Sequence, residues 1–240
     1  MKDDHPRTAM TSTSKLTTRT RVLVVDDHPA IRDALAAVIA DSNDLALCAE
    51  AKSSEQVFRA VEQFHPDVAV VDIALPDVHG LDLIANLMAR YPSLRVVVFS
   101  VYDEQVYAER AVRAGALGYV MKQEPVQEVL EAIRCAARGE IYLSRRMASR
   151  IVTRAALRRS TKPSSPTDLL TDREIAVLQL LGEGNSVENI AERLHLSRKT
   201  VETHRRNAKE KLEFDTVNEL LLFAVRWTDA QNRTGDAERS

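Results

Sequence analysis

Val22-Leu23-Val24-Val25-Asp26-Asp27 is an apolar run that ends in two carboxylates. Similar short apolar runs follow along the chain, at 45–47, 68–71, 96–99 and 118–121. Several of them are rich in β-branched residues and nearly continuous, as is typical of strands that are buried on both faces of a parallel sheet. The pattern therefore predicts five buried strands.

Segments with helical periodicity separate these runs. Each has apolar residues three and four positions apart, which gives a helix one buried face. The segments are 31–39, 53–64, 81–90, 104–113 and 126–138. Strands that alternate with helices build an open sheet with helices on both faces. Residues 21–139 are therefore predicted to form a doubly wound α/β domain with a five-stranded parallel sheet, and residues 1–20 a disordered polar tail.

The chain changes character after this domain. Eight bases and only one acid lie between Arg138 and Lys162, and the stretch from Ser160 to Pro166 has the composition of a flexible linker. We therefore interpret residues 140–167 as a basic linker that includes a helix.

Residues 168–227 are predicted to form a small all-helical domain. Thr171 and Glu174 have the spacing of a capping box ahead of the first helix, and Ser186 is placed to cap the second. A third helix is expected to open at Ser197, and Asp215 is the expected cap of a fourth. Residues 228–240 are polar and are expected to form a frayed tail.

Length and composition set the broad class. The chain has 240 residues, of which 45% are hydrophobic and 28% charged, so one or two water-soluble domains are expected. No apolar run reaches the roughly 18 residues of a membrane span, and the N-terminus lacks the apolar stretch of a secretory signal. Cys48 and Cys135 have no metal-binding spacing. These features predict a cytoplasmic protein with reduced thiols and no membrane partner.

Charged and hydroxyl side chains end four of the five predicted strands. Asp26 and Asp27 follow the first strand, Asp72 the third, Ser100 the fourth and Lys122 the fifth. Ligands of doubly wound sheets bind at this edge. Three carboxylates are unfavourable there alone, because like charges raise each other's pKa, and a bound Mg²⁺ removes the conflict. A single Asp at a strand end is often only a turn residue, but the whole set indicates a site.

Positive charge in the second domain is concentrated on one helix. Residues 197–212 carry six bases and two acids, whereas residues 166–227 as a whole carry nine bases and eleven acids. A very short turn joins this helix to the one before it. That is the pattern of a helix-turn-helix, in which the second helix enters the major groove of DNA. A solvated face or a bundle for protein contacts is the competing interpretation.

Residues 21–139 resemble the receiver domain of response regulators. The matching motifs are Leu23-Val24-Val25-Asp26-Asp27-His28-Pro29, Val71-Asp72-Ile73-Ala74-Leu75-Pro76 with Gly80, Ser100, and Gly115 to Lys122. The resemblance implies that Asp72 is the phosphoacceptor and that Lys122 and Ser100 assist it. It also implies that Asp27, Asp72 and the main chain of Ala74 ligate Mg²⁺, with Asp26 acting through water.

The same resemblance implies a conformational switch. Ser100 would move to bond the new phosphoryl oxygens, and Tyr119 would rotate inward to fill the vacated space. Tyr102, two residues past Ser100, is hypothesised to shield the acyl phosphate from water.

Residues 169–227 resemble a LuxR-type DNA-binding domain. The matching elements are 170–174, Leu178, Gly184, 188–191, 196–197, 200–201 with His204, and 211–212. By position, Glu202, Thr203 and Arg206 would face base edges. The residues expected to hold phosphates are Lys199, Thr200, Arg205 and Lys209.

The predicted fourth helix has more apolar residues than one buried stripe needs. In related domains this helix forms the dimer contact. Leu221, Phe223 and Val225 are therefore the expected dimer residues.

Together the two halves resemble a response regulator of the NarL/FixJ type. This implies phosphorylation of Asp72 by a sensor histidine kinase, which switches homodimerisation and binding to double-stranded promoter DNA, with RNA polymerase as a further partner. Such a receiver catalyses only its own phosphorylation and dephosphorylation, so the chain is not expected to be an enzyme.

A Mg²⁺-dependent phosphatase is the first alternative function, but no second acid follows Asp72 in a D-x-D pattern. A pure protein-interaction module is the second.

Overall fold

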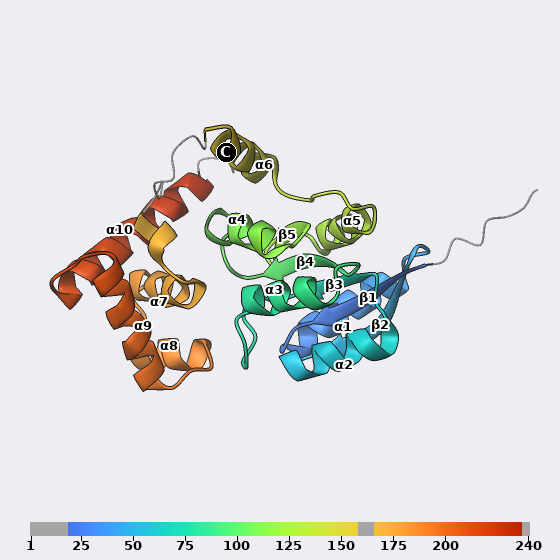
Figure 1. Cartoon of the computed structure of the whole chain (residues 1–240), viewed down its shortest axis with the longest axis horizontal. Helices are drawn as coiled ribbons and strands as arrows, with labels where there is room; N and C mark the ends of the chain where they lie inside the picture. The colour runs from blue at the N-terminus through green and yellow to red at the C-terminus, as the bar shows by residue number, and fades with distance from the viewer. Residues whose placement is uncertain (1–18, 158–165, 237–240) are drawn as a thin grey trace, which may run out of the picture.

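The structure, a computed structural model, describes residues 19–157 and 166–236, which form two lobes (Figure 1). The first lobe is built on a parallel sheet. Its strands are β1 (Thr20–Val25), β2 (Leu45–Ala51), β3 (Val68–Val71), β4 (Arg95–Ser100) and β5 (Gly118–Met121). They lie in the order β2-β1-β3-β4-β5. The predicted doubly wound sheet is confirmed, and the strand order reverses beside β1, which places the ligand crevice at the carboxyl ends of β1 and β3.

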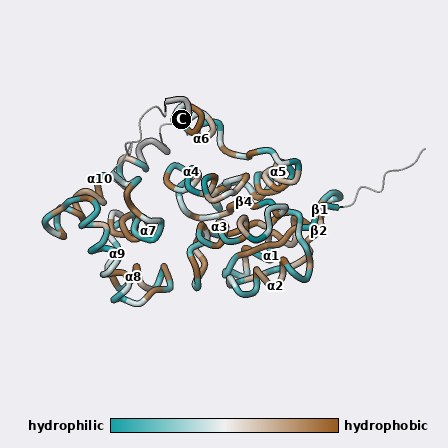
Figure 2. Tube along the Cα trace, viewed as in Figure 1, coloured by the Kyte–Doolittle hydropathy of each residue, from teal (hydrophilic) through white to brown (hydrophobic). Residues whose placement is uncertain are grey.

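Helices cover both faces of this sheet (Figure 2). They are α1 (Pro29–Ala40), α2 (Ser54–Phe64), α3 (Gly80–Arg90), α4 (Glu104–Ala114) and α5 (Val126–Ala137). The apolar residues of α1 and α5 form one core with the sheet, and those of α2, α3 and α4 form another on the opposite face. All of β3 and most of β1, β4 and β5 are buried, which explains why these strands read as continuous apolar runs.

The sheet begins slightly earlier than the sequence indicated. Thr20 is already paired in β1, and the guanidinium of Arg19 donates to the carbonyls of Ser42 and Asn43 at 3.0 Å. Arg19 and Thr20, which were expected to lie in the tail, therefore belong to the fold, because both bond to backbone groups that follow α1. Residues 1–18 lie outside the described part of the chain.

The segment after α5 pairs with the edge of the sheet. The backbone N–H of Tyr142 donates to Leu117 O at 2.7 Å, and that of Tyr119 donates to Tyr142 O at 3.0 Å. The linker thus starts as a short parallel extension beside β5.

The helix expected in the linker is α6 (Arg145–Leu157), and it packs on α4. Met147 is fully buried there, and Ser144 Oγ donates to Glu104 at 2.8 Å. Arg150 donates to the carbonyl of Gln105 at 3.1 Å. The first part of the linker is therefore fixed to the first lobe. The Ser- and Pro-rich stretch falls outside the described residues up to residue 165.

The second lobe is helical. It consists of the 3₁₀ turn η1 (Pro166–Leu169), α7 (Asp172–Gly182), α8 (Val187–Arg193), α9 (Arg198–Lys211) and α10 (Val217–Asp236). The predicted capping box is present: Thr171 N–H donates to Glu174 Oε2 at 2.8 Å, and Glu174 N–H donates to Thr171 Oγ1 at 3.4 Å. Ser186 and Ser197 cap α8 and α9 as predicted.

The prediction that Asp215 caps the fourth helix was wrong. The cap of α10 is Thr216, whose hydroxyl accepts from Glu219 N–H at 3.2 Å, while the Glu219 carboxylate accepts from the N–H groups of Asp215 and Thr216. Thr216 and Glu219 have the capping-box spacing, and this reciprocal arrangement satisfies more N–H groups than a lone Asp would.

The expected frayed tail was also wrong up to residue 236, because α10 continues to Asp236. Thr228 is buried, and it packs against Gly182 at the end of α7. A Cβ at Gly182 would lie 2.2 Å from Thr228 Oγ1 and 2.5 Å from Ala224 O, so the two helices meet there almost backbone to backbone. No helix of the described residues is both long and apolar enough to cross a membrane.

Candidate phosphorylation site and nucleic-acid interface

Three carboxylates meet at the carboxyl ends of β1 and β3. Asp26 and Asp72 are almost fully buried, and Asp27 is 18% exposed. One ligand atom from each of these residues and from His28 lies within 4.8 Å of the others. The structure therefore brings together the predicted carboxylates. It adds His28, which follows the two acids directly and was not among the predicted site residues.

Lys122 balances part of this negative charge. Its Nζ lies 2.6 Å from Asp26 Oδ2 and 2.7 Å from Asp72 Oδ2. Burial, and then the charge of Asp72, raise the pKa of Asp26. Burial alone would lower the pKa of Lys122, but Asp72 and Asp26 outweigh it and raise that pKa. One ammonium among three carboxyl groups leaves the cluster suited to a further cation.

The residues present fit Mg²⁺. Asp27 Oδ1 is buried, and among the described residues it accepts no hydrogen bond, although His28 Nδ1 lies 2.8 Å away. A buried carboxylate oxygen without a donor is a favourable ligand for a cation that prefers oxygen. The Ala74 N–H donates to Asp72 Oδ1 at 3.1 Å, so the main chain of Ala74 runs along the edge of this cluster.

A glycine lets the loop after β3 fold over Asp72. Gly80 N–H donates to Ile73 O at 2.9 Å. A Cβ at Gly80 would lie 2.6 Å from Asp72 O and 2.5 Å from Ile73 Cα. The close approach fixes the turn that presents Asp72, which explains the glycine in the motif.

Ser100 contacts Asp72, and the side chain of Tyr119 is turned into the domain. Ser100 Oγ donates to Asp72 Oδ1 at 2.8 Å, and Tyr119 is 2% exposed with its hydroxyl donating to Tyr102 O at 2.9 Å. The resemblance implied that Tyr119 moves inward on phosphorylation, but here the ring is already inside. Tyr119 thus occupies the position that was expected only after phosphorylation, while Ser100 bonds the Asp72 carboxylate itself.

Tyr102 is buried beside Ser100 and Tyr107. Its ring stacks on Tyr107 with the centroids 4.9 Å apart, and its N–H donates to Ser100 Oγ at 3.5 Å. Burial, and then Asp72, raise the pKa of Tyr102 to about 12, so its hydroxyl stays neutral. The hypothesis that Tyr102 shields an acyl phosphate stays a prediction.

We expect Lys122→Met to slow phosphorylation of the chain by acetyl phosphate about 100-fold. Removing one preorganised charge from a site where negative charge develops costs roughly 10²–10³ in rate. The rate is measured by intact mass in the presence of Mg²⁺. Lys52→Met is the matched control, because Lys52 is exposed just after β2 at the same edge of the sheet. Equal rates for the two variants would contradict the role of Lys122.

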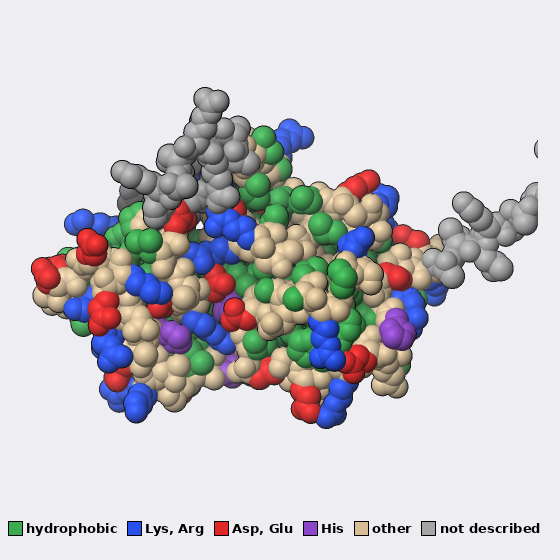
Figure 3. Space-filling view, viewed as in Figure 1, with side chains coloured by type: hydrophobic (Ala, Val, Ile, Leu, Met, Phe, Trp, Pro, Cys, Tyr) green, Lys and Arg blue, Asp and Glu red, His purple; other side chains and the backbone are tan. Residues whose placement is uncertain are grey.

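The residues of α9 that are predicted to contact DNA differ in their exposure to solvent. Lys199, Glu202 and Arg206 are exposed, whereas Thr200, Thr203, Arg205 and Lys209 are partly buried. Basic side chains gather on the outer edge of the lobe near α8 and α9 (Figure 3).

Some of these side chains have partners within the lobe. Thr203 Oγ1 donates to Lys199 O at 2.9 Å, and Lys209 Nζ donates to Asp215 O at 3.0 Å. Arg198, which sequence reasoning missed, pairs with Glu188 at 2.9 Å and with Glu202 at 3.5 Å. Exposed ion pairs of this kind are weak, so they leave the side chains available to DNA.

The predicted dimer residues differ in exposure. Leu221 and Phe223 are partly buried, and the Phe223 ring packs on Phe214 with the centroids 5.4 Å apart. Val225 is 42% exposed, and the neighbouring Leu222, which was not predicted, is 59% exposed. Phe223 therefore packs within its own lobe. Leu222 and Val225, together with Val217 (39% exposed) at the start of the helix, form the apolar surface of α10.

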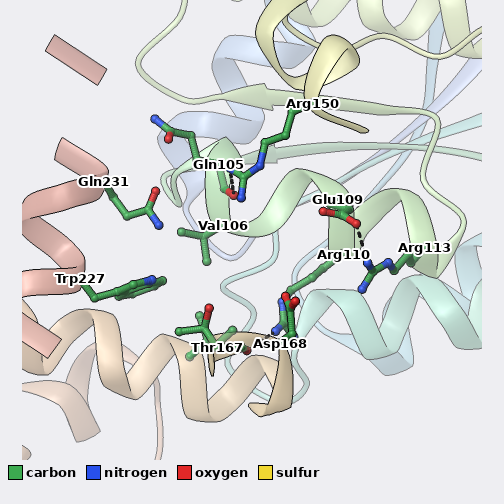
Figure 4. A pocket seen from close by; sticks show the side chains of 11 residues that line it. Gln105, Val106, Glu109, Arg110, Arg113, Arg150, Thr167, Asp168, Trp227 and Gln231 are labelled. Atoms are coloured by element: carbon green, nitrogen blue, oxygen red, sulfur yellow. Dashed lines mark hydrogen bonds and ion pairs between the residues drawn. The ribbon is translucent and has the colours of Figure 1, made fainter. Parts of the chain in front are cut away.

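The second lobe rests on α4 of the first. Arg110 of α4 pairs with Asp172 at 2.6 Å and donates to the carbonyls of Thr167 and Leu170 at 3.0 and 3.1 Å. A cavity of about 70 Å³ lies beside this contact, lined from α4, α6, η1, α7 and α10, with Trp227 on the far side (Figure 4). Arg110 thus makes several polar contacts between the two lobes.

Comparison with known families agrees with this architecture. Residues 22–134 match the response regulator receiver domain, and residues 168–224 match the bacterial regulatory proteins of the luxR family. The chain is 34% identical over 209 residues to the response regulator GacA of Pseudomonas viridiflava, covering 86% of this chain and 95% of that one. It is 27% identical over 219 residues to the transcriptional regulatory protein DegU of Brevibacillus brevis, covering 86% and 93%.

Solved structures show the same fold. A LuxR-family two-component response regulator from Aurantimonas sp. is 27% identical with a TM-score of 0.53, covering 58% of this chain and 99% of that one. The RcsB response regulator of Salmonella typhimurium is 21% identical with a TM-score of 0.60, covering 87% and 98%. The chain therefore belongs to the response regulators that join a receiver domain to a LuxR-type DNA-binding domain and regulate transcription under the control of phosphorylation.

Proposed function

We propose that Asp72 is the phosphoacceptor of this regulator and that a sensor histidine kinase is its donor. The observation that carries the proposal is the convergence of three carboxylates, Lys122 and Ser100 on one crevice. In the proposed reaction an Asp72 carboxylate oxygen attacks phosphorus, the bond to the donor breaks, and an acyl phosphate forms.

The side chains around Asp72 have separate tasks in this proposal. Asp27, Asp72 and the main chain of Ala74 would hold Mg²⁺, with Asp26 acting through water, and the bound ion would neutralise charge on the phosphoryl oxygens. Lys122 supplies a second positive charge from the other side, and Ser100 offers its hydroxyl to the new phosphoryl group.

The DNA-binding domain would act as the output. Glu202, Thr203 and Arg206 face the bases in this proposal, and Lys199, Thr200, Arg205 and Lys209 contact phosphates. Two copies joined through the apolar surface of α10 would read paired half-sites in the cytoplasm, where RNA polymerase is the further partner. The support is the concentration of positive charge on α9, whose Lys199 and Arg206 are exposed.

A binding measurement tests this output. Phosphorylated protein is first used to select a duplex from a random library, and anisotropy then gives its affinity over a range of salt. We expect phosphorylation to tighten binding, and we expect Arg206→Ala to cost about 1–3 kcal/mol on the selected duplex. Lys199→Ala should weaken binding to all duplexes and reduce the salt slope by about one.

The two variants control each other, because both remove an exposed positive charge from α9. If Arg206→Ala weakened selected and random duplexes equally, its assignment to a base would be wrong. A salt-independent affinity in the wild type would count against DNA as the partner and favour a protein-contact module.

A further inference from the structure

The turn between α8 and α9 reaches the phosphorylation pocket of the other domain. His195 lies in this turn with φ 52°, and its Nε2 lies 3.6 Å from Asp27 Oδ2. The imidazole is 47% exposed, so it lies at the surface beside Asp27 and is not part of a core. A side chain of the DNA-binding domain therefore stands beside a carboxylate that the receiver would use for its cation.

A second contact holds the turn in this place. Arg110 clamps the start of α7 through Asp172 and two backbone carbonyls. Apolar contacts also run without a break from the α3–α4 face of the receiver into the DNA-binding domain. Since α7, α8 and α9 pack on one another, the clamp at α7 fixes the position of His195 as well.

His195 lies close enough to Asp27 to interfere with a hydrated ion there. Mg²⁺ in proteins takes octahedral geometry at about 2.0–2.1 Å and keeps several of its waters. Asp27 Oδ1 accepts no hydrogen bond among the described residues, although His28 Nδ1 of the same domain lies 2.8 Å away, while Oδ2 faces His195 of the other domain. A cation on Asp27 would need its outer waters in the space that the imidazole occupies.

We infer that His195 is a residue of the phosphorylation pocket contributed by the DNA-binding domain, and that it competes with Mg²⁺ for Asp27. The inference rests on the proposed function only in that this pocket binds Mg²⁺. Because linkage is reciprocal, binding of Mg²⁺ alone lowers the docking equilibrium constant by the same factor by which docking lowers the affinity for Mg²⁺. Mg²⁺ therefore shifts the equilibrium between the docked and the undocked DNA-binding domain even before phosphorylation.

Calorimetric titration of the full chain with MgCl₂ alone tests this competition. His195→Gly removes the imidazole at a left-handed position that glycine adopts freely, so the turn is kept. Arg110→Ala removes the clamp instead. We expect both variants to bind Mg²⁺ about fivefold or more tightly than the wild type, the lower end of ordinary coupling.

His65→Gly is the matched control. His65 is also a histidine with positive φ, but it caps α2 and is exposed there. It should bind Mg²⁺ as the wild type does.

Trp227, the only tryptophan of the chain, lines the cavity between the domains and reports docking by its fluorescence. Mg²⁺ should shift its emission in the wild type. His195→Gly should start from the wild-type emission, because the Arg110 clamp remains, and respond less to Mg²⁺.

The outcomes separate the two proposals. Equal Mg²⁺ affinity in the wild type, His195→Gly and Arg110→Ala would overturn the competition and leave the metal site intact. Absence of Mg²⁺ binding in all the proteins would overturn the proposed site itself. Tighter binding in Arg110→Ala alone would show that docking matters but that His195 does not compete.

Discussion

Asp72→Asn is expected to gain no phosphoryl group on incubation with acetyl phosphate and Mg²⁺, whereas the wild type gains one. The substituted amide keeps the size of the side chain and can still bond Ser100, but an amide oxygen is not a nucleophile of carboxylate strength. Intact mass gives the result directly. EDTA should abolish the gain in the wild type, because it would withdraw the Mg²⁺ that is proposed to neutralise the phosphoryl oxygens.

The matched control is Asp77→Asn. Asp77 lies on the loop after β3 like Asp72, but it is exposed and accepts from the backbone and hydroxyl of Ser54. It should be phosphorylated as the wild type is. A full gain of phosphate in Asp72→Asn would move the acceptor to another carboxylate, and Asp26 and Asp27 would be the next to substitute.

Gly182→Ala is expected to lower the free energy of unfolding of the DNA-binding domain by about 3 kcal/mol or more. Alanine favours a helix over glycine by about 1 kcal/mol, but the new Cβ would lie 2.5 Å from the backbone oxygen of Ala224 and 2.2 Å from Thr228 Oγ1. A side chain can rotate away, whereas the backbone of α10 cannot. The clash therefore outweighs the gain in propensity, and α10 must move off α7.

Thermal unfolding followed by Trp227 fluorescence measures this loss, since Trp227 lies on α10. Gly184→Ala is the control two residues away. Gly184 has φ 82°, and a Cβ added there would meet nothing within 4 Å, so only backbone strain of about 1–2 kcal/mol applies. DNA binding should fall in Gly182→Ala while phosphorylation of Asp72 continues. Identical melting curves for the two variants would show that α10 yields more easily than the contact distances indicate.

The sequence predicted the pocket well because its chemistry sits in local motifs at strand ends. Asp26, Asp27 and Asp72 each follow a buried strand, and a parallel sheet brings such ends together whatever the helices do. The capping box of Thr171 was equally local. By contrast, the end of α10 depends on Thr228 meeting Gly182, a contact between residues far apart in sequence.

The contacts between the domains were beyond sequence reasoning for the same reason. Arg110 and Asp172 are ordinary surface residues of two separate patterns, and nothing in either pattern indicates that they pair. His195 likewise reads as a turn residue of the helix-turn-helix. The resemblance implied that Tyr119 turns inward only on phosphorylation, whereas in the structure it is already buried and its hydroxyl donates to Tyr102 O, a contact that its motif does not indicate.

The attachment of the linker shortens the tether between the domains. Since Tyr142 pairs with β5 and Met147 is buried against α4, the connection that remains runs only from Leu157 to Pro166. At about 3.5 Å per residue it spans roughly 30 Å at most. An undocked DNA-binding domain is thus kept at an effective concentration near the millimolar range, as for other short tethers. Even a weak, half-exposed contact such as that of His195 with Asp27 is then formed again after each opening.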